Sequence, residues 1–214
     1  MRDLSKSWPG VGYRHLKMPH AEKGLAVGLF GGSFNPAHEG HAHVAETALA
    51  RLGLDKVIWL VSPQNPLKPS HETQALTRRM YGAARFASGS AMLVSDAETR
   101  IGARYTIDTV RVLKARFPRV HFVWIMGADS LATFHRWRGW TQLMRSLPVA
   151  VVSRPWAGLK SRTSPAARRF DFARRPAREG RLLPLMTAPA WTYLRGPLNY
   201  ASSTAMRQRG HPRT

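Results

Sequence analysis

Short apolar runs along the chain alternate with segments in which apolar residues recur at helical spacing. The runs that have the length of strands buried on both faces lie at 26–30, 56–62, 91–96, 120–127 and 149–155. Two helical stripes between them are Ala45, Ala48, Leu49 and Leu52, and Ile107, Val110, Leu113 and Phe117. Further helices are expected at about 74–87 and 129–146. This alternation predicts an α/β fold with a Rossmann-like, doubly wound, mainly parallel sheet.

The pattern changes at both ends of this region. Residues 1–24 indicate a flexible basic leader, and 25–210 are expected to form one domain. Residues 156–180 are rich in Arg, Pro, Ala and Ser, which predicts an exposed loop. LLPLM (182–186) and WTYLRG (191–196) are expected to add short strands, and 202–209 a short C-terminal helix.

The composition narrows the possible functions only in part. A net charge of +21 suits a nucleic-acid binder, an enzyme of polyphosphate substrates, or a protein from an arginine-rich proteome. Nucleic acid is the weaker alternative, because the sequence shows neither zinc-finger spacing nor an aromatic RNA-binding strand. The chain has 0 cysteines, which excludes thiol catalysis and disulfides. No apolar run is long enough to span a membrane and no signal peptide is visible, so a cytoplasmic location is expected. The sequence does not indicate an oligomeric state.

The segment GGSFNPAHEGH, residues 31–41, lies between a predicted strand and a predicted helix. Gly31 and Gly32 would let the backbone approach a phosphate, and His41 begins the helix, where the amide groups and the dipole favour an anion. His38 and His41 could donate hydrogen bonds to phosphoryl oxygens as charge grows in a transition state. No third ligand is evident for a metal, so no metal site on the protein is predicted; His43 is expected to be a surface or packing residue.

The segment resembles the signature of the nucleotidyltransferase superfamily that contains the adenylyltransferases of NAD and coenzyme A synthesis. Its paired glycines, Asn35 and His38 resemble most closely the bacterial nicotinate-nucleotide adenylyltransferases; phosphopantetheine adenylyltransferases typically have Thr where His38 stands. Three further stretches are similar to family segments and follow in the family's order: RYTIDTV (104–110), MGADSLATFHRW (126–137) and SSTAMR (202–207). The resemblance covers roughly residues 25–210.

The resemblance implies a reaction and a cofactor. ATP and nicotinate mononucleotide would give nicotinate adenine dinucleotide and pyrophosphate, with Mg²⁺ carried on the ATP phosphates. The alternatives within the superfamily are enzymes that use nicotinamide mononucleotide, phosphopantetheine or a cytidylyl donor. An alternative of another class is a basic nucleic-acid-binding protein.

The resemblance also implies which residues form the site. His38 and His41 would be catalytic. ATP would be bound by Gly31, Gly32, Ser33, Phe34, His38, His41, Asp129, Ser202, Ser203 and Arg207. Nicotinate mononucleotide would be bound by Asn35, Lys68, Thr106, Trp137 and Arg154.

Each of these residues also has an ordinary structural interpretation. Asp129, Thr106 and the two serines could simply begin helices, and Trp137 could pack in the core, as is expected for Trp124 and Trp140. The sequence departs from the family at Ala201, where the family usually has Ile, and at Arg104, where it has a small residue. NPLK (65–68) is one residue shorter than the family's common form, which bears on Lys68.

Overall fold

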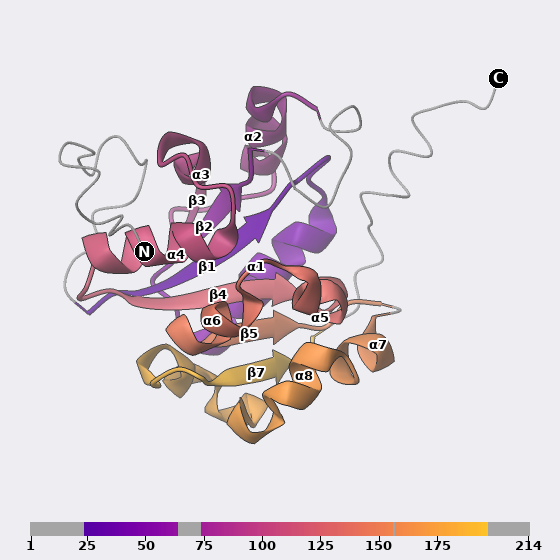
Figure 1. Ribbon diagram of the computed structural model, residues 1–214. Helices are drawn as coiled ribbons and strands as arrows, with labels where there is room; N and C mark the ends of the chain where they lie inside the picture. Colours follow the sequence, from indigo (N-terminus) through magenta and orange to yellow (C-terminus); the bar gives the residue numbers. More distant parts are fainter. Residues whose placement is uncertain (1–23, 64–73, 156, 197–214) are drawn as a thin grey trace.

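The computed structural model describes residues 24–63, 74–155 and 157–196, and within them the strands form a single parallel sheet (Figure 1). The sheet is 7-stranded, in the order β3-β2-β1-β4-β5-β7-β6. The strands are β1 (Ala26–Gly32), β2 (Lys56–Val61), β3 (Met92–Ser95), β4 (His121–Gly127), β5 (Val149–Val152), β6 (Arg174–Arg175) and β7 (Trp191–Leu194). Every pairing between them is parallel.

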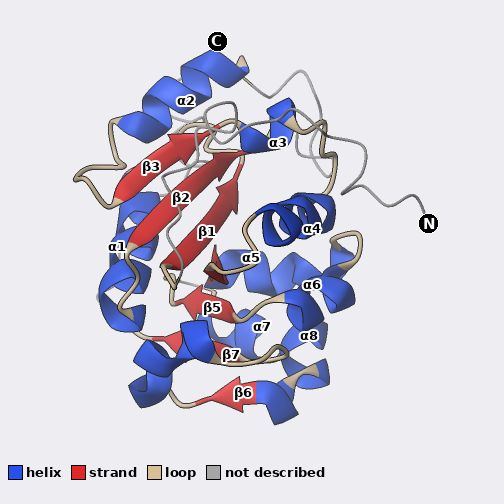
Figure 2. Ribbon diagram, turned by 90° about the vertical axis from the view of Figure 1, so that its left-hand side faces the viewer, coloured by secondary structure: helices blue, strands red, loops and turns tan. Residues whose placement is uncertain are grey.

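Helices connect the strands and cover both faces of the sheet (Figure 2). The α-helices are α1 (Glu39–Leu52), α2 (Leu76–Ala84), α3 (Ala97–Arg100), α4 (Thr106–Arg116), α5 (Ala128–Thr133), α6 (Trp140–Ser146), α7 (Gly158–Arg162) and α8 (Pro165–Arg169). The 3₁₀ helices are η3 (Phe134–Arg136), η4 (Asp171–Ala173) and η5 (Ala177–Leu185).

The core has two layers, one on each face. Buried residues of α1, α2 and η5 pack on one face, and buried residues of α3, α4, α5, α6 and α8 pack on the other. The central strands are buried on both sides because they are covered from both sides, and this explains their uninterrupted apolar runs. In the described part of the chain, no helix is long and apolar enough to cross a membrane. The expected cytoplasmic location stays a prediction.

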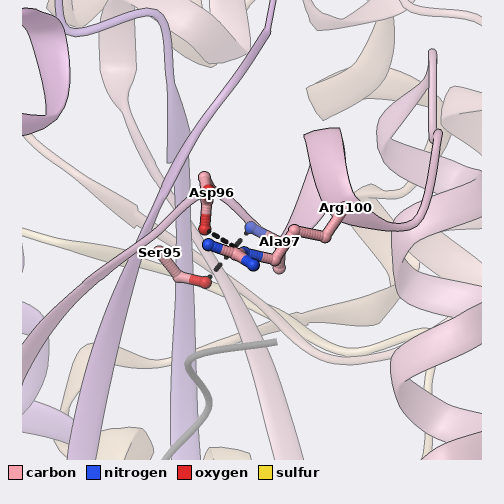
Figure 3. Close-up of polar contacts among 4 residues, drawn as sticks. All are labelled: Ser95, Asp96, Ala97 and Arg100. Carbon is pink, nitrogen blue, oxygen red and sulfur yellow. Dashed lines mark hydrogen bonds and ion pairs between the residues drawn. The ribbon is translucent and has the colours of Figure 1, made fainter. Parts of the chain in front are cut away.

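The junction between β3 and α3 is fixed by two local contacts (Figure 3). The Ser95 hydroxyl accepts a hydrogen bond from the backbone N–H of Ala97 at 3.2 Å, and Arg100 pairs with Asp96 at 2.7 Å, one helical turn back.

The helix α3 also carries a buried acid, Glu98. Its carboxyl group accepts a hydrogen bond from the Thr109 hydroxyl of α4 at 3.3 Å. Burial raises the pKa of Glu98 to about 7.

The α/β fold class and its main elements are confirmed. The structure has the expected strands in the runs at 26–30, 56–62, 91–96, 120–127 and 149–155, and WTYLRG contains β7. Both helical stripes lie on the buried faces of their helices, with Leu49 only partly buried. Doubly wound topology follows from the strand order, in which β2 and β3 extend from one side of β1 and β4, β5, β7 and β6 from the other.

Three of the expected elements are wrong. The single helix expected at 129–146 is split into α5, η3 and α6; the extended backbone of Trp137, with ψ 137°, and the left-handed Gly139, with φ 69°, separate η3 from α6. The exposed loop expected at 156–180 contains α7, α8 and η4, and Ala166, Ala167 and Phe170 are buried in the core layer on the α5 side of the sheet. LLPLM belongs to η5 and not to a strand. The basic leader up to residue 23 and the helix expected at 202–209 lie outside the described residues.

Candidate active site

The GGSFNPAHEGH segment lies where the sheet changes direction. β1 pairs with β2 on one side and with β4 on the other. The chain leaves β1 into α1 on one face of the sheet and leaves β4 into α5 on the other. In parallel sheets the two outgoing connections separate at such a point and leave a crevice at the carboxyl ends of the strands. Gly31 and Gly32 end β1 on one side of this point, and Asp129 follows β4 on the other.

Phe34 anchors the loop between β1 and α1. Its side chain is 1% exposed, and its ring lies 5.4 Å from that of Phe30 and 5.1 Å from that of Trp59. Its φ of 45° is the one left-handed value among the described non-glycine residues, a conformation that costs about 1–2 kcal/mol. The buried aromatic cluster offsets this cost, so packing fixes the turn that leads to His38.

His38 and His41 hold each other at the beginning of α1. His38 is the residue before the helix, and its backbone N–H donates to Nδ1 of His41 at 3.2 Å. The two ring centroids are 3.9 Å apart, and the His41 ring also contacts the edge of Phe34. An imidazole nitrogen that accepts a hydrogen bond carries no proton, so neutral His41 has its proton on Nε2. The backbone therefore sets His41 as a donor through Nε2.

Arg154 brings positive charge to the same place. This residue follows β5, its side chain is 10% exposed, and its Nε lies 3.7 Å from Oδ1 of Asp129. A Cβ at Gly40 would collide with the Arg154 guanidinium and the His38 ring, so α1 and Arg154 touch only because residue 40 is glycine. The positive end of the α1 dipole and a cation are thus in contact, which favours binding of an anion.

His38 is neutral in this surrounding. Burial, and then the charge of Arg154, lower the pKa of His38 from 6.5 to about 4, against a smaller opposite effect of Asp129. The ring is 2% exposed. Burial and a neighbouring cation both destabilise the protonated, charged form of the ring. His38 is therefore a neutral imidazole near neutral pH.

Two tryptophans connect the glycines at the end of β1 to the segment that contains Trp137. The Trp124 ring lies directly under Gly31, where a Cβ would overlap it. Trp124 is fully buried, and its ring meets that of Trp137 at 6.3 Å and 81°. Trp137 is partly buried and also packs against Phe134, with centroids 5.2 Å apart. Trp140 packs against Phe134 and Phe170, so its expected packing role is confirmed, as is that of Trp124.

The Thr106 segment lies beside the Trp137 segment. Thr106 is the first residue of α4, and Tyr105 precedes it. The guanidinium carbon of Arg138 lies 4.9 Å from the centre of the Tyr105 ring, and that of Arg104 lies 5.7 Å from it. The contact joins residues 105–106 to 137–138, although the two segments are far apart in sequence.

The comparisons with known proteins identify the family. A model of the cytidylyltransferase-like family matches residues 29–209. The chain is 74% identical over 185 residues to the "Probable nicotinate-nucleotide adenylyltransferase" of Caulobacter sp. (strain K31), covering 86% of this chain and 98% of that protein. The protein of the same name from Rhizobium johnstonii is 49% identical over 190 residues, covering 89% and 96%. This chain belongs to the nicotinate-nucleotide adenylyltransferase family.

The fold of this family member is also found in solved structures. The Plasmodium falciparum nicotinic acid mononucleotide adenylyltransferase complexed with NaAD has a TM-score of 0.63 and 14% identity, covering 86% of this chain and 83% of that one. The same enzyme complexed with APC has a TM-score of 0.62 over 87% and 83%. At this identity the likeness shows the fold, and it agrees with the parallel sheet described above.

Some of the family's motif residues cannot be placed against the others. Lys68, Ser202, Ser203 and Arg207 lie outside the described residues. Asn35 is 4% exposed, and its Oδ1 accepts from the backbone N–H of Gln74 at 3.4 Å. Within the residues that the structure describes, no group of three or more His, Cys, Asp or Glu is placed to hold a metal ion.

Arg79 is the polar residue beside this site that the motifs did not reveal. It is 2% exposed, and its guanidinium donates to backbone carbonyls of the loop after β1 and of the end of β2. The sequence does contain a signal for it. Leu76, Arg79, Met80 and Ala83 follow the i, i+3, i+4, i+7 spacing of a buried helical face, and an arginine in such a stripe needs a buried set of acceptors.

The His38 pKa gives the site a measurable pH dependence. Between pH 6.5 and about 4 the unfolded chain binds a proton at His38 that the folded state does not. Wild type should therefore lose unfolding free energy relative to His38→Gln as the pH falls through this window, by about 3 kcal/mol at most. Urea unfolding of both proteins from about pH 7 to about pH 4 measures this difference.

The difference between the two proteins is the informative quantity because Glu98 acts in the opposite direction. Its pKa is raised from 4.5 to about 7, so the folded state binds the extra proton there and gains stability as the pH falls. This contribution is common to both proteins and cancels. A gap between wild type and His38→Gln that stays constant with pH would contradict the neutral state of His38.

Proposed function

We propose that this protein transfers the adenylyl group of ATP to nicotinate mononucleotide, forming nicotinate adenine dinucleotide and pyrophosphate in NAD biosynthesis. The observation that carries the proposal is the composition of the crevice at the ends of β1 and β4. A helix N-terminus, the Arg154 cation and two histidines meet there. Such a site suits the binding and transfer of phosphates.

The reaction needs positioning and charge stabilisation more than acid–base chemistry. An oxygen of the nicotinate mononucleotide phosphate attacks the α-phosphorus of ATP, and the bond from that phosphorus to the oxygen bridging to the β-phosphate breaks. Pyrophosphate leaves with the electron pair of that bond. Because the attacking oxygen is already an anion, no general base is required. This agrees with a His38 that remains neutral near pH 7.

The donors in the crevice can stabilise the charge that develops on the α-phosphate. We assign Nε2–H of His41 as the oriented donor, because the backbone of His38 occupies Nδ1. His38 supplies a second neutral imidazole, and the Arg154 guanidinium adds a fixed positive charge. Gly31, Gly32, Ser33 and Phe34 form the wall beside the phosphates.

The remaining predicted residues divide between the two substrates. We place Asp129, whose side chain is 60% exposed, at the ATP ribose, and Ser202, Ser203 and Arg207 at the leaving phosphates. Trp137 would stack on the pyridine ring, with Thr106, Asn35 and Lys68 around the nicotinate. The contact of Arg138 with Tyr105, which joins the Trp137 and Thr106 segments, supports this grouping.

We also propose that Mg²⁺ accompanies ATP. The described part of the site offers the Asp129 carboxylate, which is close to Arg154, and no protein cage of ligands. Mg²⁺ keeps several waters and binds well through substrate phosphates, so the residues fit a metal carried in on the nucleotide. There it would neutralise charge on the triphosphate.

A substrate panel tests the function. Purified protein with ATP and Mg²⁺ should release pyrophosphate with nicotinate mononucleotide, and more slowly with nicotinamide mononucleotide. Phosphopantetheine with ATP, and CTP in place of ATP, are expected to give no product. Absence of release with nicotinate mononucleotide under any divalent metal would refute the proposal. Faster turnover of another pair would reassign the chain within the superfamily, and a salt-sensitive gel shift with RNA but no turnover would support nucleic-acid binding.

The role of His41 is tested by replacing it alone. His41→Ala should lower kcat by about 10²-fold or more, because a donor to the transition state is lost. His43→Ala is the matched control, since His43 lies on the same helix beside Gly196 and has no assigned role in the reaction. Steady-state rates of the two folded variants decide the point. Equal rates for His41→Ala and wild type would show that the donor role is wrong.

The role of Trp137 predicts an effect on one substrate. Trp137→Leu keeps an apolar contact with Trp124 and Phe134 but removes the flat ring. The KM for nicotinate mononucleotide should rise by the equivalent of about 1–3 kcal/mol, with little change in the KM for ATP. Trp140→Phe serves as the control. An unchanged KM for nicotinate mononucleotide in Trp137→Leu would return Trp137 to the packing role.

A further inference from the structure

The Arg79 guanidinium, on α2, donates all of its described hydrogen bonds to backbone carbonyls. Nε donates to Gln74 at 2.8 Å, and Nη2 donates to Pro63 at 2.8 Å. Nη1 donates to Ser33 at 2.9 Å and to Ser62 at 2.6 Å. The side chain is buried, and burial lowers the pKa of its guanidinium, which in proteins nevertheless stays protonated. One buried cation therefore connects three separate stretches of backbone.

These carbonyls lie where β1 and β2 separate. The last paired residues of the two strands are Gly32 and Val61, and the N–H of Ser62 still donates to the carbonyl of Gly32 at 3.0 Å. The hydrogen bonds between the two strands end at this pair. Beyond it, Nη1 of Arg79 links the two segments by donating to the carbonyls of both Ser33 and Ser62. The guanidinium thus fixes the separation between the two segments that follow β1 and β2.

The same network continues into the loop that precedes His38. Arg79 donates a hydrogen bond to the backbone carbonyl of Gln74. The backbone N–H of Gln74 in turn donates to Oδ1 of Asn35 at 3.4 Å. The loop is therefore attached at Ser33 through its carbonyl and at Asn35 through its side chain. Between these two points stands Phe34 with its left-handed backbone.

The chemistry of arginine suits this task, and stability alone does not explain it. Arginine offers donors in a rigid planar fork, whereas lysine has one nitrogen and cannot reach carbonyls on opposite sides. A buried cation is costly to desolvate, and a well-packed apolar side chain of similar size often stabilises a protein as well or better. An arginine at this position of an apolar helical stripe therefore indicates a role in holding the backbone segments in a fixed arrangement.

We propose that Arg79 is a positioning residue for adenylyl transfer: it fixes residues 33–35 against the end of β2 so that His38 and His41 stand where the α-phosphate reacts. The inference rests on the proposed function of the site. Arg79 itself touches no substrate in this account. Its effect reaches the reaction through the backbone of the loop.

Two variants and a neighbouring control test this role. Arg79→Met fills the space without donors, and Arg79→Lys keeps the charge but can reach only part of the carbonyl set. Arg78→Met and Arg78→Lys are the matched controls, since Arg78 is the adjacent, exposed residue of the same helix. For each protein, kcat and both KM values are measured with ATP and nicotinate mononucleotide, well below the melting temperature found by circular dichroism.

A positioning role predicts a loss in kcat that folding does not explain. Both Arg79 variants should show kcat lowered by about 10- to 100-fold per folded molecule, because small displacements of reacting groups have effects of that size. KM for ATP should change less than kcat, and the Arg78 variants should match wild type. A purely structural role would lower the melting temperature and leave kcat of the folded protein unchanged.

The outcomes separate this inference from the proposed function. If wild type releases no pyrophosphate from these substrates, the proposed function is at fault. If wild type is active and Arg79→Met or Arg79→Lys retains its kcat, the positioning role is refuted. If neither variant folds even in the cold, Arg79 acts as a determinant of stability, and the inference is overturned as well.

Discussion

The site depends on one topological constraint, the position of β1 between β2 and β4 in an all-parallel sheet. The chain must leave β1 toward one face and β4 toward the other, and the strands end at the same edge because they run in the same direction. The crevice therefore arises from strand order before any functional side chain is considered. The loop of residues 33–38 and the helix that begins at Glu39 bring the two histidines to this edge.

A second constraint is electrostatic, since the site concentrates positive potential while its histidines remain neutral. The α1 N-terminus and Arg154 meet at Gly40, where a Cβ would overlap the Arg154 guanidinium and the His38 ring. Their combined field favours phosphate and, together with burial, disfavours a proton on His38. The same features thus explain both the affinity for an anion and the use of hydrogen-bond donors without a charged acid or base. Asp129, in the first turn of the helix that follows the neighbouring strand β4, lies 3.7 Å from Arg154 and offsets part of this field.

The sequence was sufficient for the parts of the molecule that local rules control. Buried parallel strands and amphipathic helices leave a periodic signal, and short motifs in the family's order carry the resemblance. The expectation failed at 156–180, where Ala166, Ala167 and Phe170 are buried in the core layer that also contains α5, and such long-range burial outweighs a composition typical of loops. The helical stripe indicates that Arg79 is buried, but the carbonyls that it binds and the contact between Arg154 and Gly40 join remote segments, so spacing along the chain does not reveal these partners.

Histidine NMR shows most directly whether the backbone sets His41 as a neutral donor to phosphate. Long-range ¹H–¹⁵N spectra of protein labelled on its histidines, assigned with His41→Gln, report which ring nitrogen carries the proton. We expect a proton on Nε2, an accepting Nδ1, and a shift of the Nε2 signals when a non-hydrolysable ATP analogue is added. A proton on Nδ1, or signals that ignore the analogue, would contradict this role of His41.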